Sequence, residues 1–236
     1  MLSNHHSSFG TLYIVATPIG NLKDITYRAV EILQHVDLIF CEDTRTSRVL
    51  LKHYDITTPV QSYHAHSTTE KHTAIVSLLK TGKDIALISD AGTPGISDPG
   101  SLLVNTIQQT GEVFPIIPVP GPSALVALLS VSGFTGNEFS FLGFVPHKKG
   151  RETFFKNLEQ YGHSVIFYES SHRILKTLDA IRTLYKDQYT VHIGREMTKL
   201  FETYISGTPD EIYQYIEADK NQQKGEFVVL LIPRKK

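Results

Sequence analysis

A chain of 236 residues is long enough for one large domain or two small ones, each with a buried core. Its content of 41% hydrophobic and 20% charged residues is that of a globular protein and excludes a disordered or fibrous chain. The net charge of −1 excludes a global attraction to nucleic acid, so any contact with RNA has to come from local patches.

Cysteine usage and apolar runs indicate the compartment. The single cysteine, Cys41, excludes an intrachain disulfide, and its apolar neighbours favour a buried structural thiol. No segment reaches the roughly 18 consecutive apolar residues that span a bilayer. The first nine residues are polar and do not have the apolar core of a signal peptide. We therefore expect a cytoplasmic protein.

The first half of the chain alternates short apolar runs with segments of helical periodicity. The predicted strands are residues 12–16, 38–41, 84–89 and 113–119. The predicted helices are residues 25–36, 44–54, 70–80, 99–110 and 123–132. Asp98 is the expected N-cap of the fourth helix, with Pro99 at its first position and Gly111 just past its end. Strands that alternate with helices predict right-handed crossovers and a mostly parallel sheet.

The second half, from about residue 137, has a different pattern. Strands are predicted at 139–141, 164–168, 190–194, 202–206 and 227–232, and helices at 151–161, 175–184 and 208–218. Thr208 to Glu211 forms a capping-box sequence with Pro209 at the first helical position. Two strands follow each other closely before that helix, which predicts a mixed sheet, and the apolar run 227–232 predicts a central strand. The predicted fold is α/β with two lobes, residues 10–120 and 121–236.

Loops rich in glycine, proline and small polar residues follow the predicted strands of the first lobe. They are residues 17–21, 42–45, 89–100 and 119–124. Ligands of open α/β sheets bind at the carboxyl ends of strands, and such loops bring rigid backbone close to a ligand. They suit a neutral, zwitterionic or adenine-bearing ligand; the alternative is that they are ordinary tight turns.

Other familiar motifs are missing from the sequence. It contains no G-x-G-x-x-G after the first strand and no G-x-x-x-x-G-K-[ST], which argues against a common dinucleotide site and against a nucleotide hydrolase. The absence of C-x-x-C excludes a zinc ribbon.

The loops resemble those of a known family. The segments TPIGNLKD at 17–24, EDTR at 42–45, the run 89–100 and PGPSA at 120–124 resemble the tetrapyrrole methylase superfamily. Further matches follow in order at 144–146, 168–173, 195–199 and 224–226, so the resemblance extends from about residue 10 to residue 232. Within the superfamily, the chain is similar to the branch that methylates the ribose 2′-hydroxyl of a cytidine in small-subunit ribosomal RNA.

The resemblance implies a two-domain fold, a homodimer and S-adenosylmethionine bound between the lobes. Carried over by position, the cofactor residues implied in the first lobe are Pro18, Asp90, Gly92, Thr93 and Ile96. Those implied in the second lobe are Ser123, Ala124, Tyr168 and Glu169. Relatives that act on tetrapyrroles often have a more glycine-rich first loop, so a porphyrin substrate is not expected.

A ribose hydroxyl is a poor nucleophile when neutral, so a base or a cation that lowers its pKa assists methyl transfer. Glu42 and Asp43 directly follow a buried strand and are the predicted catalytic residues. The alternative is that they cap the helix that begins at Thr44 or pair with Arg45. The other ionisable residues in these loops are Asp24, Asp90, Glu169, Lys199 and Glu226.

RNA binding requires local positive charge. The predicted substrate-binding residues are Arg45, Lys148 and Lys149. Further basic groups are Arg48, the segment 147–151, Arg195 with Lys199, and residues 234–236, and each alone is equally compatible with a solvated surface.

No metal is predicted. His64, His66 and His72 lack a carboxylate or thiol at a familiar ligand spacing, so a polar surface loop or an RNA contact is favoured for them. Two other functions remain open on this sequence: a small-molecule methyltransferase, and a non-catalytic assembly factor that binds ribosomal RNA.

Overall fold

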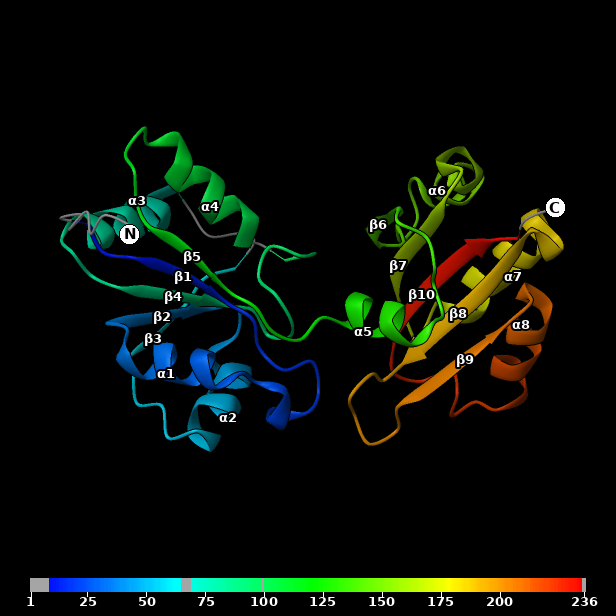
Figure 1. Cartoon of the computed structure of the whole chain (residues 1–236), viewed down its shortest axis with the longest axis horizontal. Coiled ribbons are helices and arrows are strands. Elements are labelled where there is room, and N and C mark those ends of the chain that lie inside the picture. The colour runs from blue at the N-terminus through cyan, green and yellow to red at the C-terminus, as the bar shows by residue number, and fades with distance from the viewer. Residues whose placement is uncertain (1–8, 65–68, 99, 235–236) are drawn as a thin grey trace. The chain divides into compact units, whose positions relative to one another are not determined.

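The computed structural model describes residues 9–64, 69–98 and 100–234. The chain divides into two compact units that meet between Pro122 and Ser123, two residues beyond the expected boundary. Each unit has its own five-stranded sheet (Figure 1). Several sequence predictions lie outside the described residues: Pro99 as first helical residue, the histidine at 66, and the lysines at 235 and 236.

The first unit is a doubly wound parallel sheet, which confirms the predicted fold class. Its strands are β1 (Leu12–Val15), β2 (Leu38–Cys41), β3 (Val60–Ser62), β4 (Ile85–Ile88) and β5 (Ile116–Val119), and all their pairings are parallel in the order β3-β2-β4-β1-β5. Its helices are η1 (Leu22–Asp24), α1 (Tyr27–His35), α2 (Thr44–His53), α3 (Thr69–Lys80) and α4 (Gly100–Gln109).

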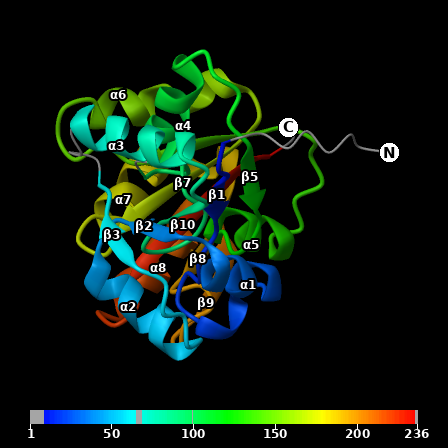
Figure 2. The ribbon, with the colours of Figure 1, turned by 90° about the vertical axis from the view of Figure 1, so that its left-hand side faces the viewer.

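Alternation along the strands builds two cores in this unit. In β4, Ile85 and Leu87 pack with α3 and α4, whereas Ala86 and Ile88 pack with α1 and α2. Figure 2 shows these two helix pairs on opposite sides of the sheet. Cys41 is fully buried in the second core, as predicted, and burial raises the pKa of its thiol. Both sheet faces are therefore covered, and the loops at the strand ends remain for binding.

The second unit has the predicted mixed sheet. Its strands are β6 (Phe139–Phe144), β7 (Ser164–Ser170), β8 (Tyr189–Arg195), β9 (Thr203–Gly207) and β10 (Glu226–Pro233) in the order β6-β7-β10-β8-β9. Only β6 and β7 pair in parallel, and β10 is central, as its apolar sequence predicts. Its helices are α5 (Ala124–Val131), α6 (Arg151–Lys156), η2 (Leu158–Tyr161), α7 (Ile174–Tyr185), η3 (Lys186–Gln188) and α8 (Pro209–Ala218).

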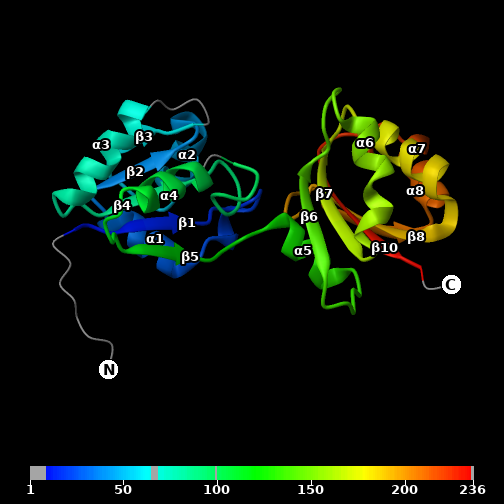
Figure 3. The ribbon, with the colours of Figure 1, turned by 90° about the horizontal axis from the view of Figure 1, so that it is seen from above.

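Helices cover the two faces of this sheet unequally. One core joins the strands to α6, α7 and α8, and α5 lies on the opposite face (Figure 3). The predicted capping box of α8 is present: the Glu211 N–H donates to Thr208 Oγ1 at 3.2 Å, and the Thr208 N–H donates to Glu211 Oε2 at 2.8 Å. These reciprocal bonds satisfy two N–H groups that a helix start leaves without partners.

The structure departs from the sequence predictions mainly at four elements. The short strand β3 and the turn η1 were not predicted, because each has only three residues, none of them fully buried, and carries no apolar pattern. Strand β5 begins at Ile116 rather than at 113, since Pro115 has no N–H for a ladder and Val113 is exposed. The predicted helix 151–161 is two pieces, α6 and η2, separated by Asn157, and the tighter second turn buries Leu158.

Candidate functional site

Main-chain bonds tie the loops after β1 and β4 together at the carboxyl edge of the first sheet. The Thr17 N–H donates to the Gly92 carbonyl at 2.9 Å, and the Gly92 N–H donates to the Thr17 carbonyl at 3.1 Å. The Thr17 hydroxyl donates to the Ser89 carbonyl at 3.0 Å, and the Ser89 hydroxyl donates to the Gly92 carbonyl at 3.1 Å. The two loops therefore form one rigid cradle.

The loop after β5 joins this cradle through glycine. A Cβ on Gly121 would lie 2.9 Å from the Ala16 Cβ, so only glycine lets this loop lie against the end of β1. The Thr93 hydroxyl donates to the Pro122 carbonyl at 3.4 Å. Gly92 has a φ of +86°, in the left-handed region that side chains rarely adopt. The backbone at Gly92 is thus fixed in a conformation that another residue would hold only under strain.

The predicted cofactor residues of the first unit line this cradle in different ways. Pro18 is buried, whereas Asp90 is exposed and Ile96 is 44% exposed. Asp98 folds the remainder of the loop, since its Oδ1 accepts from the Gly95 N–H at 2.5 Å and from the Gly100 N–H at 2.9 Å. The cradle therefore offers main-chain groups with one exposed carboxylate and one exposed apolar side chain.

The two predicted catalytic carboxylates, at the end of β2, have different environments. Asp43 caps α2, accepting from the Arg45 N–H at 2.8 Å, and pairs with the Arg45 guanidinium at 2.6 Å. The Arg45 side chain holds the pKa of Asp43 at about 2. Both features of the alternative interpretation are therefore present, and a carboxylate with so low a pKa is a weak proton acceptor at neutral pH.

Glu42 has the environment of a proton acceptor. It is half-buried, and no side chain in the described part of the chain hydrogen-bonds its carboxylate. Burial, together with the carboxylates of Asp98 and Asp90, raises the pKa of Glu42. Asp90 also accepts from the Asp43 N–H at 3.1 Å, which ties the β2 loop to the β4 loop. From the sequence Asp98 was predicted only as a helix cap. Its position two residues before Gly100 carried no signal that its charge also acts on Glu42.

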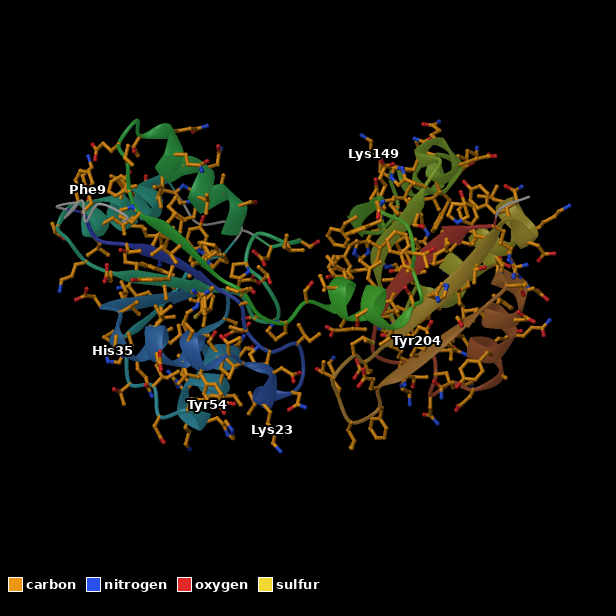
Figure 4. All side chains as sticks on the ribbon, in the orientation of Figure 1. Phe9, Lys23, His35, Tyr54, Lys149 and Tyr204 are labelled. Carbon is orange, nitrogen blue, oxygen red and sulfur yellow. The ribbon has the colours of Figure 1, made fainter. Side chains whose placement is uncertain are left out.

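Basic residues predicted to contact RNA are exposed in each unit. The Arg45 side chain is 88% exposed despite its ion pair, and Arg48 lines a groove of about 550 Å³ beside α2. Lys148 and Lys149 are exposed between β6 and α6, and Lys149 extends away from the ribbon in Figure 4. All four side chains can therefore reach an anionic partner.

Arg195 and Lys199 do not add to this basic surface. Arg195 is 8% exposed and donates to the carbonyls of Lys224, Phe201 and Asn221 at 2.7–3.0 Å. The Lys199 ammonium lies 2.9 Å from Glu196 and 2.8 Å from Glu226. Both cations therefore hold loops of the second unit together instead of forming the suggested RNA contact.

Three of the four predicted cofactor residues of the second unit lie near the start of α5. Ser123 is the N-cap position of α5, and Ala124 is its first residue. Burial raises the pKa of Tyr168, opposed by hydrogen bonding to the Leu125 main chain and the Ser123 side chain. Tyr168 therefore lies beside the residues with which the family resemblance groups it.

Glu169 is buried in an ion-pair network. Its side chain has no exposed surface, and Oε1 lies 2.8 Å from both the Arg173 guanidinium and the Ser170 N–H. Oε2 accepts from the Thr177 hydroxyl at 2.6 Å and lies 3.3 Å from the Arg151 guanidinium. Both carboxylate oxygens are thus occupied by groups of the second unit itself.

The histidine prediction was wrong for His72. It is buried and shares a 3.0 Å hydrogen bond with the buried Tyr63 hydroxyl, so it belongs to the core of the first unit. Within residues 9–64, 69–98 and 100–234, no group of three or more His, Cys, Asp or Glu side chains is placed to hold a metal ion. No helix in this described part has both the length and the apolar surface to cross a membrane.

The sequence matches the family described as Tetrapyrrole (Corrin/Porphyrin) Methylases over residues 11–213. The chain belongs to the tetrapyrrole methylase family. This methylase is 46% identical over 226 residues to the ribosomal RNA small subunit methyltransferase I of Xylella fastidiosa, with 95% of the chain and 82% of the relative covered. It is 47% identical to the protein of that name from Pasteurella multocida, with 94% of the chain and 79% of the relative covered. It is 45% identical to the one from Haemophilus influenzae, with 94% of the chain and 78% of the relative covered.

Solved structures support the fold of this tetrapyrrole methylase. A diphthine synthase superimposes with a TM-score of 0.72 at 14% identity, covering 96% of this chain and 91% of that one. A cobalt precorrin-4 methyltransferase superimposes with a TM-score of 0.65 at 14% identity, covering 93% and 94% of the two chains. The predicted two-lobed fold of the family is thus confirmed.

Proposed function

We propose that this tetrapyrrole methylase transfers the methyl group of S-adenosylmethionine to small-subunit ribosomal RNA, at the ribose 2′-oxygen of a cytidine. The observation that carries the proposal is the 45–47% identity, over nearly the whole chain, to proteins named ribosomal RNA small subunit methyltransferase I. The 2′-oxygen and the cytidine rest on the loop resemblance alone. We further propose a cytoplasmic homodimer.

The cradle at the edge of the first sheet fits S-adenosylmethionine. Its backbone passes through Gly92, where a Cβ would point toward Ile19 and the Pro122 carbonyl, and it offers main-chain groups to a zwitterionic ligand. Pro18, Asp90, Thr93 and Ile96 are the proposed further contacts there. When bound, the cofactor supplies an electrophilic methyl group on a sulfonium centre. In the second unit, Ser123, Ala124, Tyr168 and Glu169 are the proposed contacts, Glu169 with its carboxylate already engaged.

The residues of this chain then have two tasks. Glu42, with its raised pKa, accepts the proton of the ribose hydroxyl as that oxygen attacks. Arg45, Lys148 and Lys149 hold phosphates so that the hydroxyl is oriented toward the methyl group. Asp43 is proposed to lie next to the reacting group. Its strong ion pair with Arg45 favours a role in positioning over a role as proton acceptor.

Replacing Gly92 by valine should abolish measurable cofactor binding. A β-branched residue is strongly disfavoured at a φ of +86°, and its methyl groups would enter the space between Ile19 and Pro122. Isothermal calorimetry with S-adenosylmethionine on the folded variant, checked by circular dichroism, measures the effect. Gly133→Val is a matched control, because that glycine also has a positive φ, of +68°, but lies at the end of α5 with nothing within 4 Å of its Cβ. Wild-type affinity in a folded Gly92→Val protein would remove this cradle from the cofactor site.

Methyl transfer from tritiated S-adenosylmethionine tests the function itself. We expect incorporation into undermethylated small ribosomal subunits, and we expect digestion of the product to release 2′-O-methylcytidine. Naked ribosomal RNA and a set of tetrapyrroles serve as competing acceptors. Transfer to a tetrapyrrole alone would establish a small-molecule methyltransferase, and tight subunit binding without transfer would establish an assembly factor. Either outcome would contradict the proposal.

A further inference from the structure

Positive charge gathers on two segments of the second unit that follow β6 and β7. Residues 145–151 contain Lys148, Lys149 and Arg151, and residues 169–176 contain Arg173 and Lys176. The one carboxylate within these two segments is Glu169, so they carry a net charge of +4 with histidines neutral. The whole chain has a net charge of −1, which makes the concentration of charge in 15 residues a local feature.

The sheet brings these two segments to the same edge. Strands β6 and β7 are parallel neighbours, with Phe144 opposite Tyr168, so the loops that follow them leave the sheet at the same end. The Val145 N–H donates to the Tyr168 carbonyl at 3.2 Å. The Arg173 guanidinium donates to the Val145 carbonyl at 2.7 Å, which ties the second segment to the first. The segments therefore form one surface, which we call the twin-loop patch (residues 147–151 and 172–176).

The buried network around Glu169 makes this patch rigid. Arg151 reaches Glu169 from the first segment and also donates to the Thr177 hydroxyl in α7 at 2.8 Å. Arg173 reaches the same carboxylate from the second segment at 2.8 Å. One carboxylate between two guanidiniums leaves a net positive charge beneath the patch. An anion at the surface is therefore attracted by the fixed guanidiniums as well as by mobile side chains.

The outer cations of the patch have no partner within the described residues. Lys148, Lys149 and Lys176 are exposed, and no described carboxylate lies within ion-pair distance of their ammonium groups. The first turn of α7 contains no acidic residue that would offset them. His147 and His172 are exposed beside them. The patch therefore presents uncompensated positive charge with hydrogen-bond donors, which is the chemistry that recognises phosphate.

We propose that the twin-loop patch binds the phosphate backbone of the RNA substrate, with Lys176 as a phosphate contact alongside Lys148 and Lys149. This inference rests on the proposed function for the identity of the RNA. It adds the segment after β7 to the substrate surface and gives Glu169 a positioning role, because its carboxylate holds both loops. Insertion into a lipid surface would require exposed large apolar side chains. Residues 147–151 and 172–176 expose none.

Salt dependence of RNA binding gives a direct readout of phosphate contacts. Each contact to single-stranded RNA contributes about 0.7 to the slope of log affinity against log salt concentration. Lys176→Gln should therefore reduce that slope by about 0.7, and the double variant Lys148→Gln with Lys149→Gln by about 1.4. The matched control is Lys186→Gln with Lys220→Gln, since both are exposed lysines of the same unit outside the patch. The control should leave the slope unchanged.

The experiment uses the full chain and two probes. Fluorescence anisotropy with single-stranded poly(U) at several salt concentrations gives the slope, and steady-state methylation of undermethylated small subunits gives KM. We expect the patch variants to lower the slope and to raise KM severalfold, with S-adenosylmethionine affinity unchanged.

The possible results distinguish a failure of the patch proposal from a failure of the proposed function. Unchanged slopes in both patch variants would overturn the inference, and so would a lowered slope without any rise in KM. A second result would overturn it in favour of a membrane surface. In that result the wild type binds anionic lipid vesicles, and the patch variants lose this binding but retain poly(U) binding. If subunits are not methylated by the wild type, the proposed function fails, and reduced poly(U) slopes would still support the patch as an RNA-binding surface.

Discussion

We expect Glu42→Gln to lower the rate of methyl transfer by about 10²–10⁴-fold, the usual contribution of a general base. The substitution keeps the size of the side chain but removes its ability to accept a proton. Glu42 directly follows the buried end of β2, and its pKa is raised by burial and by the carboxylates of Asp98 and Asp90. A raised pKa makes a carboxylate a stronger base, and Glu42 has no hydrogen-bonding side chain among the described residues to satisfy it otherwise.

Single-turnover methylation of small subunits at saturating cofactor measures this effect. The wild-type rate should rise with pH as the Glu42 carboxyl loses its proton, because only the carboxylate form accepts one. That acidic limb should lie above the usual range of a glutamate and should disappear in Glu42→Gln. Calorimetry should give an unchanged S-adenosylmethionine affinity for the variant.

Asp43→Asn is the matched control for this prediction. Asparagine caps helices as well as aspartate does, so α2 should remain intact although the ion pair with Arg45 is lost. Turnover per folded enzyme should fall far less than in Glu42→Gln, because Asp43 is proposed to position Arg45 and not to accept the proton. The opposite result, a large loss in Asp43→Asn with near-normal turnover in Glu42→Gln, would exchange the roles of the two residues.

The largest expected effect on stability comes from Glu169→Gln. Removing one partner from a buried ion pair lowers the free energy of unfolding by about 3–5 kcal/mol, because the remaining charge is left without compensation. Here two guanidiniums would be left, those of Arg151 and Arg173, whose side chains are 18% and 13% exposed. A neutral amide cannot compensate both, and one of its two polar ends is itself a donor.

Urea denaturation followed by far-UV circular dichroism measures this loss in the second unit. Glu152→Gln is the control, because Glu152 is 81% exposed and pairs with Lys156 on the surface of α6. That change should leave the unfolding transition where it is in the wild type. Equal transitions for the two variants would contradict the network as a source of stability. A folded Glu169→Gln protein of normal stability that has lost S-adenosylmethionine affinity would instead establish this carboxylate as a cofactor ligand.

Local sequence signals predicted most of the fold. The capping box at Thr208, the continuous apolar run of β10 and the strand β2 were identified from a few adjacent residues each. The glycine-rich loops were predicted to bring backbone close to a ligand, which stays a prediction; in the structure Gly121 lets its loop lie against the end of β1. These features depend on the backbone conformation and the burial of a single element. The hydrophobic periodicity and the residue types of that element specify both.

The environment of individual side chains could not be predicted in the same way. Arg195 was suggested as an RNA contact or a solvated surface charge, yet its acceptors are carbonyls of residues 201, 221 and 224, which only the folded chain brings together. For His72 a surface loop or an RNA contact was predicted. Its burial could not be foreseen, because its partner, the Tyr63 hydroxyl, lies outside its own helix. The difference between Glu42 and Asp43 likewise depends on which of two adjacent carboxylates turns toward Arg45.

The central position of β10 has a consequence for synthesis of the protein. Residues 226–233 form the middle of the second sheet, and their partners in β7 and β8 lie 30 or more residues earlier in the chain. Until a ribosome has added these residues, β7 and β8 have no strand between them and expose unpaired N–H and C=O groups. The first unit has all five of its strands before residue 122 and can fold in the meantime. A nascent chain halted shortly before β10 should therefore carry one folded unit and one that is prone to aggregate.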